Sequence, residues 1–319
     1  MNKNIKILKG LVIKSTGSWY LVKTIDNKLI NCKIKGKFRL QGIKTTNPVA
    51  VGDKVELDHT EGQDVGVIHK ISPRENHIIR KSTKLSKVSH IIAANIDLAL
   101  LIVTIREPRI TTGFIDRFLV TAEAYHIPAA LVFNKIDIYN EKDNTRLDEL
   151  CQIYEDAEYK TFRVSALKGR NISSLIEEIT NKVCLFSGVS GVGKSALVNA
   201  IEPGLTLKTG DISNYHKKGK HTTTFPEMHP LSFGGYIIDT PGIREFGLVE
   251  FRKGEIAERF PEFRRHQHDC RFNNCTHIHE PGCAVKEAIE SGNLAVSRYD
   301  SYLRIYNDEY LDKGLWEWE

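Results

Sequence analysis

No stretch of this sequence approaches the roughly 20 consecutive apolar residues that a membrane-spanning helix requires. The first residues, Met1 to Lys6, lead into no long apolar run either, so no signal peptide is expected. Cysteine is scarce as well, with six in 319 residues, and three of the six fall between 270 and 283. This usage argues against a disulfide framework and predicts a reducing compartment and a metal site. We therefore expect a cytoplasmic protein that makes no membrane contact.

Charge is unevenly distributed along the chain. Residues 1–90 hold 18 Lys and Arg against 7 Asp and Glu, whereas the remainder holds 27 against 33. A basic segment on an otherwise acidic protein predicts contact with nucleic acid. A basic surface that faces only solvent would give the same pattern, so charge alone leaves both interpretations open.

The basic segment also carries the pattern of a small all-β domain. Turn signals separate five short apolar runs, and five strands in about sixty residues predict a closed barrel of the OB type. The expected strands are Leu11–Lys14, Trp19–Ile25, Leu29–Ile34, Lys54–Leu57 and Val65–Ile71. Such barrels bind looped RNA through a basic groove and stacking aromatics. The candidate contacts are Lys33, Lys35, Lys37 and Arg39, with Trp19, Tyr20 and Phe38 either stacking on bases or filling the barrel.

Glycine is concentrated in a segment that predicts phosphate binding. The pattern G-x-x-x-x-G-K-[ST] occupies residues 188–195, after the apolar run Val183–Phe186 and before a helix expected over Ser195–Ile201. In such a P-loop, backbone N–H groups and a helix N-terminus face phosphate oxygens. The lysine would reach the β- and γ-phosphates, and the serine hydroxyl would ligate Mg²⁺. The expected nucleotide-binding residues are Gly188, Val189, Ser190, Gly191, Val192, Gly193, Lys194, Ser195 and Ala196.

Apolar runs upstream of the P-loop predict a buried parallel sheet. Ile96–Thr104, Ala129–Phe133 and Thr161–Val164 read as strands, and residues 112–126 have helical spacing. The second run ends in the N-K-x-D pattern of residues 134–137, and the third in Ser165-Ala166-Leu167.

The N-K-x-D pattern predicts selectivity for guanine. The carboxylate of Asp137 would accept from N1–H and the exocyclic 2-amino group, donors that adenine lacks at these positions. Asn134 and Lys135 would brace the base and the P-loop. Ser165 and Ala166 resemble the loop that contacts guanine O6 through its backbone.

Two further segments resemble the switches of a nucleotide-dependent enzyme. Residues 206–224 are irregular and predict a loop that orders on nucleotide. One threonine among 222–224, for which we choose Thr223, would ligate Mg²⁺. A strand over Tyr236–Ile238 leads into D-x-x-G, where Asp239 would hold Mg²⁺ through water and the Gly242 N–H would contact the γ-phosphate.

The order of these motifs is unusual. N-K-x-D and S-A-L precede the P-loop, whereas a GTPase ordinarily runs from the P-loop through D-x-x-G to N-K-x-D. The complete but rotated set predicts a circularly permuted α/β P-loop GTPase domain. We expect three domains: an all-β OB barrel at 1–75, the permuted GTPase at 76–247, and a mainly α-helical zinc-binding domain at 248–319.

The last domain holds the metal pattern. Cys270, Cys275, His277 and Cys283 follow C-x₄-C-x-H-x₅-C, the ligand set of a closed tetrahedral structural zinc site. His279, His266 and His268 are alternative fourth ligands that spacing does not exclude. Helices are expected over Glu255–Arg259, Ala284–Ser291 and Leu294–Tyr310, with a tyrosine stripe on the last that favours packing.

Taken together, these motifs resemble the circularly permuted, small-ribosomal-subunit-dependent GTPases of bacteria over nearly the whole chain. The resemblance implies a late assembly factor that binds the small subunit and its rRNA, hydrolyses GTP to GDP when the subunit stimulates it, and is linked to release of another maturation factor. It implies GTP or GDP, Mg²⁺ and one Zn²⁺ as ligands. We expect the protein to be a monomer.

One position departs from the ordinary pattern of GTPases. The glutamine that positions the attacking water follows D-x-x-G, and here Ile243 stands in its place. The resemblance and the chemistry of imidazole both favour His221 as the water-positioning residue, although it could equally serve RNA phosphates. Two other functional classes remain open: a nucleotide-gated RNA-binding adaptor with negligible hydrolysis, and an ATP-using enzyme, against which Asp137 argues.

Overall fold

The computed structural model describes residues 5–35, 48–60, 62–80, 90–205, 226–239 and 253–307. The chain forms two compact units, each assembled from several segments. The first combines residues 1–98, 177–186 and 210–243, and the second combines 99–176, 187–209 and 244–319. The three-domain division expected from the sequence stays a prediction. Within the described ranges, no helix is both long and apolar enough to cross a membrane.

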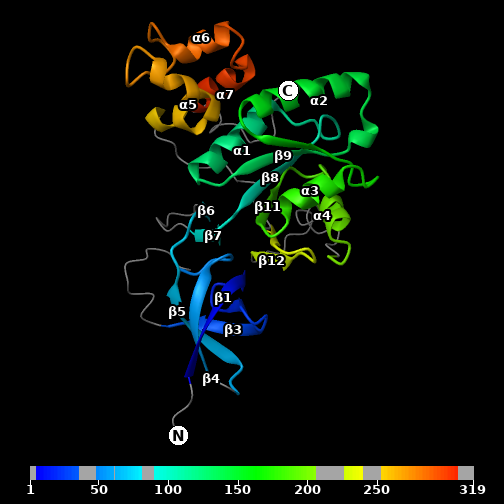
Figure 1. Cartoon of the computed structure of the whole chain (residues 1–319), viewed down its shortest axis with the longest axis vertical. Coiled ribbons are helices and arrows are strands. Elements are labelled where there is room, and N and C mark those ends of the chain that lie inside the picture. Colours follow the sequence, from blue (N-terminus) through cyan, green and yellow to red (C-terminus); the bar gives the residue numbers. More distant parts are fainter. Residues whose placement is uncertain are drawn as a thin grey trace, which may run out of the picture. The chain divides into compact units, whose positions relative to one another are not determined.

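A closed five-stranded barrel begins the first unit (Figure 1). Hydrogen-bonded pairing runs β1-β2-β3-β5-β4, and a further β1–β4 pairing completes the ring. Only the β3–β5 pair is parallel. The strands are β1 (Ile5–Ser15), β2 (Tyr20–Thr24), β3 (Leu29–Ile34), β4 (Lys54–Thr60) and β5 (Val65–Ile71). The expected barrel is confirmed, and two of its strands have the predicted bounds.

The alternation of inward and outward side chains fills the barrel. Its core contains Val12, Tyr20, Val22, Ile30, Cys32, Val49, Val55, Leu57 and Ile68. Tyr20 is 1% exposed, so it fills the barrel and does not stack on a ligand. Trp19 is 40% exposed, and the Lys33 ammonium lies 4.2 Å from its ring centroid. Of the two aromatics, only Trp19 is available for stacking.

The rest of the first unit joins the barrel to other strands. β6 (His77–Arg80) and β7 (His90–Ala94) form an antiparallel pair. β11 (Val183–Ser187) lies parallel to β13 (Tyr236–Asp239), and β12 (Glu227–Pro230) pairs antiparallel with β13. β12 also pairs with β1, so strand pairing is continuous from the barrel to β11.

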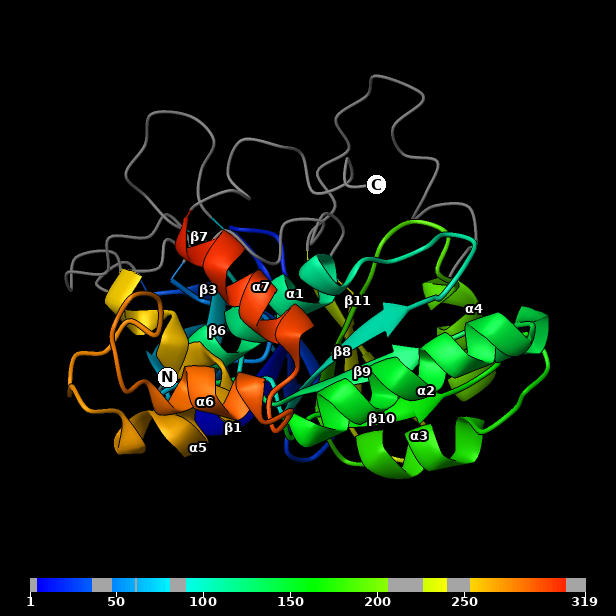
Figure 2. The ribbon, with the colours of Figure 1, turned by 90° about the horizontal axis from the view of Figure 1, so that it is seen from above.

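Three parallel strands form the sheet of the second unit, in the order β10-β9-β8. Every residue of β8 is buried, as its continuous apolar sequence predicts. The strands are β8 (Leu98–Val103), β9 (Ala129–Phe133) and β10 (Lys160–Arg163). Helices α1 (Thr112–Ala124) and α2 (Glu141–Asp156) cover one face (Figures 1 and 2). The remaining helices of this part are α3 (Ile172–Ile179) and α4 (Lys194–Ile201).

The sequence analysis missed α2, although its start carries a recognisable signal. The Asn140 side chain accepts from the Asp143 N–H, and the Asp143 carboxylate accepts from the Asn140 N–H. This reciprocal capping box satisfies donors that a helix N-terminus leaves unpaired. The N-x-x-D pattern after the N-K-x-D motif could have predicted the helix.

Short helices and turns make up the C-terminal part of the second unit. The expected helix over Glu255–Arg259 is wrong: the chain forms the 3-10 turns η4 (Lys253–Glu255) and η5 (Ala257–Arg259) there. They end at Phe260, whose extended backbone precedes α5. The following elements are α5 (Pro261–His266), η6 (Gln267–Asp269), α6 (Ala284–Glu290) and α7 (Val296–Tyr306). The tyrosine stripe of α7 packs into this core, as predicted: Tyr302 is buried, and Tyr299 and Tyr306 lie against the cluster.

Candidate nucleotide and metal sites

The carboxyl ends of the parallel strands bring two predicted motifs together in the second unit. Asn134 directly follows β9, and its N–H donates to Val103 O of β8 over 2.9 Å. Val164, just after β10, donates to Phe133 O over 2.8 Å. The N-K-x-D and S-A-L segments therefore leave the sheet at one edge, where ligands of α/β sheets bind.

Asn134 connects these two segments to the P-loop. Its side-chain amide donates to Val192 O over 2.9 Å, and its side-chain oxygen accepts from the Ala166 N–H over 3.0 Å. The residue is 1% exposed, so its side chain is shielded from water. Segments that are 58 and 32 residues from Asn134 in sequence thus meet at one side chain.

The turn that carries Asp137 is held by its neighbours. Lys135 adopts a left-handed backbone conformation with φ 65°, and residues 136–138 form the 3-10 turn η2 (Ile136–Ile138). The Ser165 hydroxyl donates to an Asp137 carboxylate oxygen and accepts from the Lys168 N–H over 3.1 Å. Ser165 is fully buried, so it fixes the orientation of the carboxylate from the protein side.

The P-loop backbone requires glycine at two positions. Gly188 has φ 146°, and a Cβ there would lie 2.4 Å from Ile102 O of β8. Gly193 has φ 92°, and a Cβ there would lie 2.5 Å from the Asn134 side-chain nitrogen. Both distances are shorter than any real contact of a Cβ, so the fixed glycines of the motif follow from close packing as well as from backbone conformation.

Lys194 extends across the inner side of the loop. Its ammonium lies 2.5 Å from Gly188 O and 2.7 Å from Val189 O. α4 begins at the same residue, so the lysine charge and the N-terminal end of the helix dipole coincide. This arrangement suits an anionic phosphate chain.

A segment that the sequence analysis did not single out supports the N-K-x-D turn. The Lys135 ammonium donates to Glu107 O over 2.6 Å. The Tyr139 hydroxyl donates to Asn134 O over 2.6 Å and accepts from the Ile105 N–H over 2.9 Å. A tyrosine at this position matches no phosphate or guanine pattern, so nothing in the sequence pointed to it.

The remaining predicted nucleotide contacts are not tested by the structure. His221, Thr223 and Gly242 lie outside the described residues. So do Lys37, Phe38 and Arg39 of the expected RNA contacts, and Tyr310 of the tyrosine stripe. Asp239 ends β13 in the first unit, but its side chain is not described.

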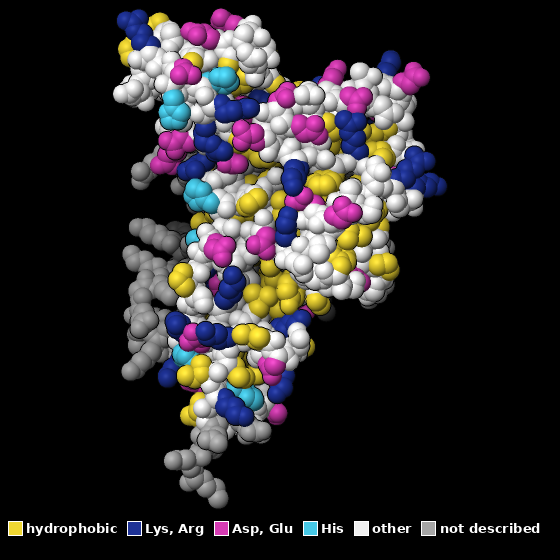
Figure 3. Space-filling view, in the orientation of Figure 1, with side chains coloured by type: hydrophobic (Ala, Val, Ile, Leu, Met, Phe, Trp, Pro, Cys, Tyr) yellow, Lys and Arg dark blue, Asp and Glu magenta, His cyan; other side chains and the backbone are white. Residues whose placement is uncertain are grey.

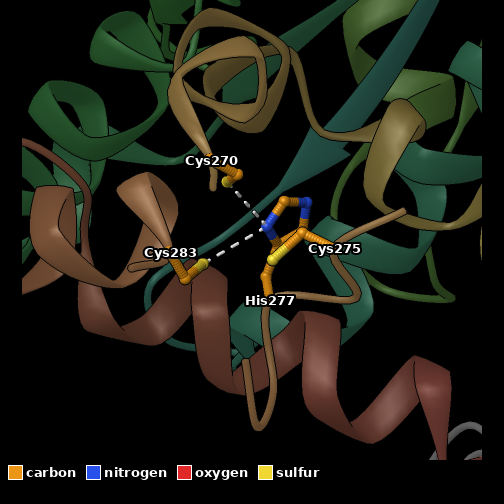
Figure 4. A group of neighbouring side chains, drawn as sticks. All are labelled: Cys270, Cys275, His277 and Cys283. Carbon is orange, nitrogen blue, oxygen red and sulfur yellow. Dashed lines mark hydrogen bonds between the residues drawn. The ribbon is translucent and has the colours of Figure 1, made fainter. Parts of the chain in front are cut away.

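The predicted metal-binding residues converge in the C-terminal part. The nitrogen or sulfur atoms of Cys270, Cys275, His277 and Cys283 all lie within 4.8 Å of one another (Figure 4). His277 Nδ1 lies 3.7 Å from Cys270 Sγ and 3.4 Å from Cys283 Sγ. Tetrahedral bonds of about 2.3 Å to sulfur and 2.0 Å to nitrogen place ligand atoms roughly 3.5–3.8 Å apart. The cluster therefore has the donor set and the dimensions of one zinc site.

The electrostatics of the cluster agree with this interpretation. Burial lowers the pKa of His277, which keeps its ring neutral as a metal ligand must be. Desolvation raises the pKa of Cys275 and Cys283, so thiolates here need a cation to stabilise them. His279 is exposed and contributes its backbone N–H to Glu280, which favours His277 as the fourth ligand.

Glu280 organises the loop between His277 and Cys283. Its carboxylate accepts from the Thr276 N–H and hydroxyl over 2.9 and 2.7 Å, and from the Ile278 N–H over 3.1 Å. These donors, above all the Thr276 hydroxyl, lower the pKa of Glu280 to about 2. From α7, the Tyr299 hydroxyl donates to His277 O over 2.7 Å. The sequence analysis overlooked Glu280, because it sought metal ligands and this carboxylate binds the loop backbone.

Comparisons with known proteins identify relatives of this chain. A family model described as RsgA GTPase matches residues 71–249, and one described as RsgA N-terminal domain matches residues 9–68. A Bacteroides thetaiotaomicron protein named small ribosomal subunit biogenesis GTPase RsgA 2 is 53% identical over 302 residues, covering 95% of this chain and 97% of that protein. A Flavobacterium psychrophilum protein named small ribosomal subunit biogenesis GTPase RsgA is 55% identical over 303 residues, covering 93% and 92%.

Solved structures give the same result. The crystal structure of YjeQ from Thermotoga maritima is 35% identical, with a TM-score of 0.80, and the match covers 97% of this chain and 100% of that one. The crystal structure of YloQ, described as a circularly permuted GTPase, is 28% identical, with a TM-score of 0.77 and 98% coverage of both chains. The expected fold class, with its permuted motif order, is confirmed. The chain belongs to the RsgA GTPase family and is a GTP-hydrolysing enzyme.

Proposed function

We propose that this GTPase binds the small ribosomal subunit, acts in its late maturation, and hydrolyses GTP to GDP and phosphate when the subunit stimulates it. The observation that carries the nucleotide part is the buried Asn134 side chain, which joins the N-K-x-D, S-A-L and P-loop segments by two hydrogen bonds. The ribosomal part is supported by relatives that are named for small-subunit biogenesis and match nearly the whole chain.

The proposed guanine pocket uses groups from these three segments. Asp137, oriented by the Ser165 hydroxyl, accepts from the guanine edge. Ala166 contributes its backbone, and Lys135 lies against the base. The P-loop from Gly188 to Ala196 surrounds the phosphates, with the Lys194 ammonium released from the loop carbonyls toward them.

The proposed catalytic arrangement also uses residues outside the described ranges. Ser195 and Thr223 would hold Mg²⁺, Asp239 would support it through water, and the Gly242 N–H would contact the γ-phosphate. Bound Mg²⁺ neutralises charge that develops on the phosphates. His221 positions the attacking water in place of the glutamine that Ile243 replaces.

The test is a GTPase assay titrated with purified small subunits. We expect slow hydrolysis by the free protein and a strong rise with added subunits. Flat, near-zero turnover at every subunit concentration would instead identify a nucleotide-gated adaptor. His221→Ala should retain GTP affinity and lose the stimulated rate, whereas unchanged stimulation would remove His221 from the mechanism.

We propose that the barrel contributes contacts to rRNA. Its exposed Trp19 and the neighbouring Lys33 offer a stacking face and a cation. Figure 3 shows that, on the face in view, Lys and Arg side chains lie among acidic and hydrophobic ones. On this face, the basic side chains of the described residues would therefore act as separate contacts to rRNA phosphates.

We propose one structural zinc ion at Cys270, Cys275, His277 and Cys283. Elemental analysis of the purified protein should give about one zinc per chain. Cys275→Ser should lose it, while Cys151→Ser, which changes a buried cysteine of α2, should keep it. Equal zinc content in both variants would contradict the assignment. A cytoplasmic monomer, and a link to another maturation factor, remain part of the proposal.

A further inference from the structure

Tyr139 occupies a half-buried position behind the guanine-recognition segment. Its hydroxyl accepts from the Ile105 N–H and donates to Asn134 O, over 2.9 and 2.6 Å. A backbone N–H can only donate and a carbonyl can only accept, so the role of the hydroxyl in each bond is fixed. Burial raises the pKa of Tyr139 to about 12, so the hydroxyl keeps its proton throughout the neutral range.

The two groups that Tyr139 joins lie just beyond the ends of neighbouring strands. Ile105 follows β8, and Asn134 follows β9. The last backbone bond between the two strands runs from the Asn134 N–H to Val103 O, and the Tyr139 hydroxyl adds a bridge beyond it, between Asn134 O and the Ile105 N–H. This bridge therefore helps to set where the Ile105 segment lies relative to Asn134.

The segment that Tyr139 holds is tied to the nucleotide motifs at further points. Glu107 O accepts from the Lys135 ammonium over 2.6 Å, and Arg106 pairs with Asp143 at 3.3 Å. A Cβ built on Gly191 would contact Pro108 Cδ at 3.5 Å, so the segment also lies against the P-loop. Residues 105–108 thus support Lys135 on one side and approach the phosphate loop on the other.

We infer that Tyr139 is a positioning residue for guanine-nucleotide binding, acting through Asn134 and through Lys135. Its hydroxyl holds the Asn134 backbone, whose side chain joins the three motifs, and holds the segment whose Glu107 carbonyl orients the Lys135 ammonium. The inference rests on the proposed roles of Asn134 and Lys135 in nucleotide binding.

The test compares Tyr139→Phe with Tyr159→Phe. The control removes a hydroxyl from another buried tyrosine of the same unit, whose partner is Glu123 at 3.4 Å. For Tyr139→Phe we expect the Kd for GDP to be about 10-fold higher than that of the unchanged protein, equivalent to about 1.4 kcal/mol of binding free energy. The KM for GTP should rise in parallel while kcat at saturating GTP stays within about twofold, because groups that act on the phosphates are unchanged. Tyr159→Phe should leave both quantities unchanged.

The outcomes separate this inference from the proposed function. A wild-type protein that binds GDP no better than ADP would overturn the guanine site itself. Wild-type binding that Tyr139→Phe leaves unaltered would overturn only the role of Tyr139, as would an equal loss in Tyr159→Phe.

A measurement on the unchanged protein covers the case in which Tyr139→Phe does not fold. Binding linkage is reciprocal, so if the hydroxyl bridge favours nucleotide, nucleotide must favour the bridge. Hydrogen exchange of the Ile105 amide should therefore slow when GDP is added. Exchange at Ile105 that is identical with and without saturating GDP would overturn the inference.

Discussion

The proposed discrimination between bases depends on one side chain, the carboxylate of Asp137. A carboxylate has only acceptors, and guanine presents two donors on the edge that it would contact. An asparagine has one acceptor and one donor, which matches the N1–H and the carbonyl of xanthine. We expect Asp137→Asn to weaken GDP binding about 10- to 100-fold and to strengthen binding of xanthosine diphosphate, as competition for a fluorescent nucleotide would measure.

The control for this exchange is Asp148→Asn, on α2. Asp148 pairs with Arg163 at the surface and lies outside the three motifs. It should bind GDP as the unchanged protein does. If Asp137→Asn kept its preference for GDP over xanthosine diphosphate, the carboxylate would not read the guanine edge.

Gly193 tests whether packing, and not only backbone conformation, demands glycine in the P-loop. Gly193→Ala combines a left-handed φ of 92° with a Cβ 2.5 Å from the Asn134 amide. Gly169→Ala has a left-handed φ of 65°, but its Cβ would have no atom within 4 Å. The left-handed conformation alone costs about 1–2 kcal/mol. Both variants should unfold at lower temperature, but only Gly193→Ala should also lose GDP binding by more than about 10-fold in titration calorimetry. If both variants bound GDP equally well, the close packing of Gly193 against Asn134 would not matter for nucleotide binding.

At the scale of elements, a buried ionic network joins α7 to α1 and α5. Arg298 donates to Asp116 over 2.7 Å and to both carboxylate oxygens of Glu262 over 2.6 and 3.2 Å. The Ser301 hydroxyl also donates to Asp116, as does the Tyr154 hydroxyl, over 2.9 Å. Arg298 is 1% exposed and Asp116 is fully buried. Every charge in the network has a partner, and this is the condition under which buried ions are tolerated.

Removing the cation alone should destabilise the protein strongly. Arg298→Met leaves two buried carboxylates uncompensated, and we expect the free energy of unfolding to fall by about 3–5 kcal/mol in urea titrations of the zinc-loaded protein. Arg298→Met with Asp116→Asn and Glu262→Gln should recover much of the loss, since no buried charge is left. Arg146→Met, at an exposed pair with Glu149 on α2, should change the free energy of unfolding by under about 1 kcal/mol. If Arg298→Met lowered the free energy of unfolding no more than Arg146→Met does, the network would not hold α7 in place.

The sequence predicted those elements whose signals are local. Short apolar runs between turn signals predicted the barrel strands, and a continuous apolar run predicted β8 as a buried strand. The segment Glu255–Arg259 predicts a helix, but a segment of this length does not distinguish an α-helix from the 3-10 turns that the chain forms there. The motif residues were identified by spacing. Tyr139, Glu280 and Arg298 were not, because each acts through contacts that only the folded chain creates.

At the scale of the whole molecule, the permuted order still brings the N-K-x-D, S-A-L and P-loop segments together, because each of them follows the carboxyl end of a strand. Asn134 and Val192 are 58 positions apart, yet they share a hydrogen bond. The carboxyl ends of parallel strands meet at one edge whichever strand comes first in the chain. For these three segments, the sequence order therefore changes which loops connect the strands and not which segments meet.

The uneven charge along the chain predicts how the proposed binding to the small ribosomal subunit should respond to salt. Each cation that contacts a phosphate releases a counterion, which steepens the fall of log K with log salt by about 0.7–0.9. Lys35, exposed at the end of β3, lies in the basic segment, whereas Lys142 is exposed on α2 in the acidic remainder. In sedimentation assays with small subunits across a salt series, Lys35→Gln should reduce the slope by up to about 1, and Lys142→Gln should leave it unchanged. If neither variant altered the slope, Lys35 would not contact rRNA phosphate. If Lys142→Gln alone reduced the slope, the phosphate contacts would lie on the acidic remainder of the chain.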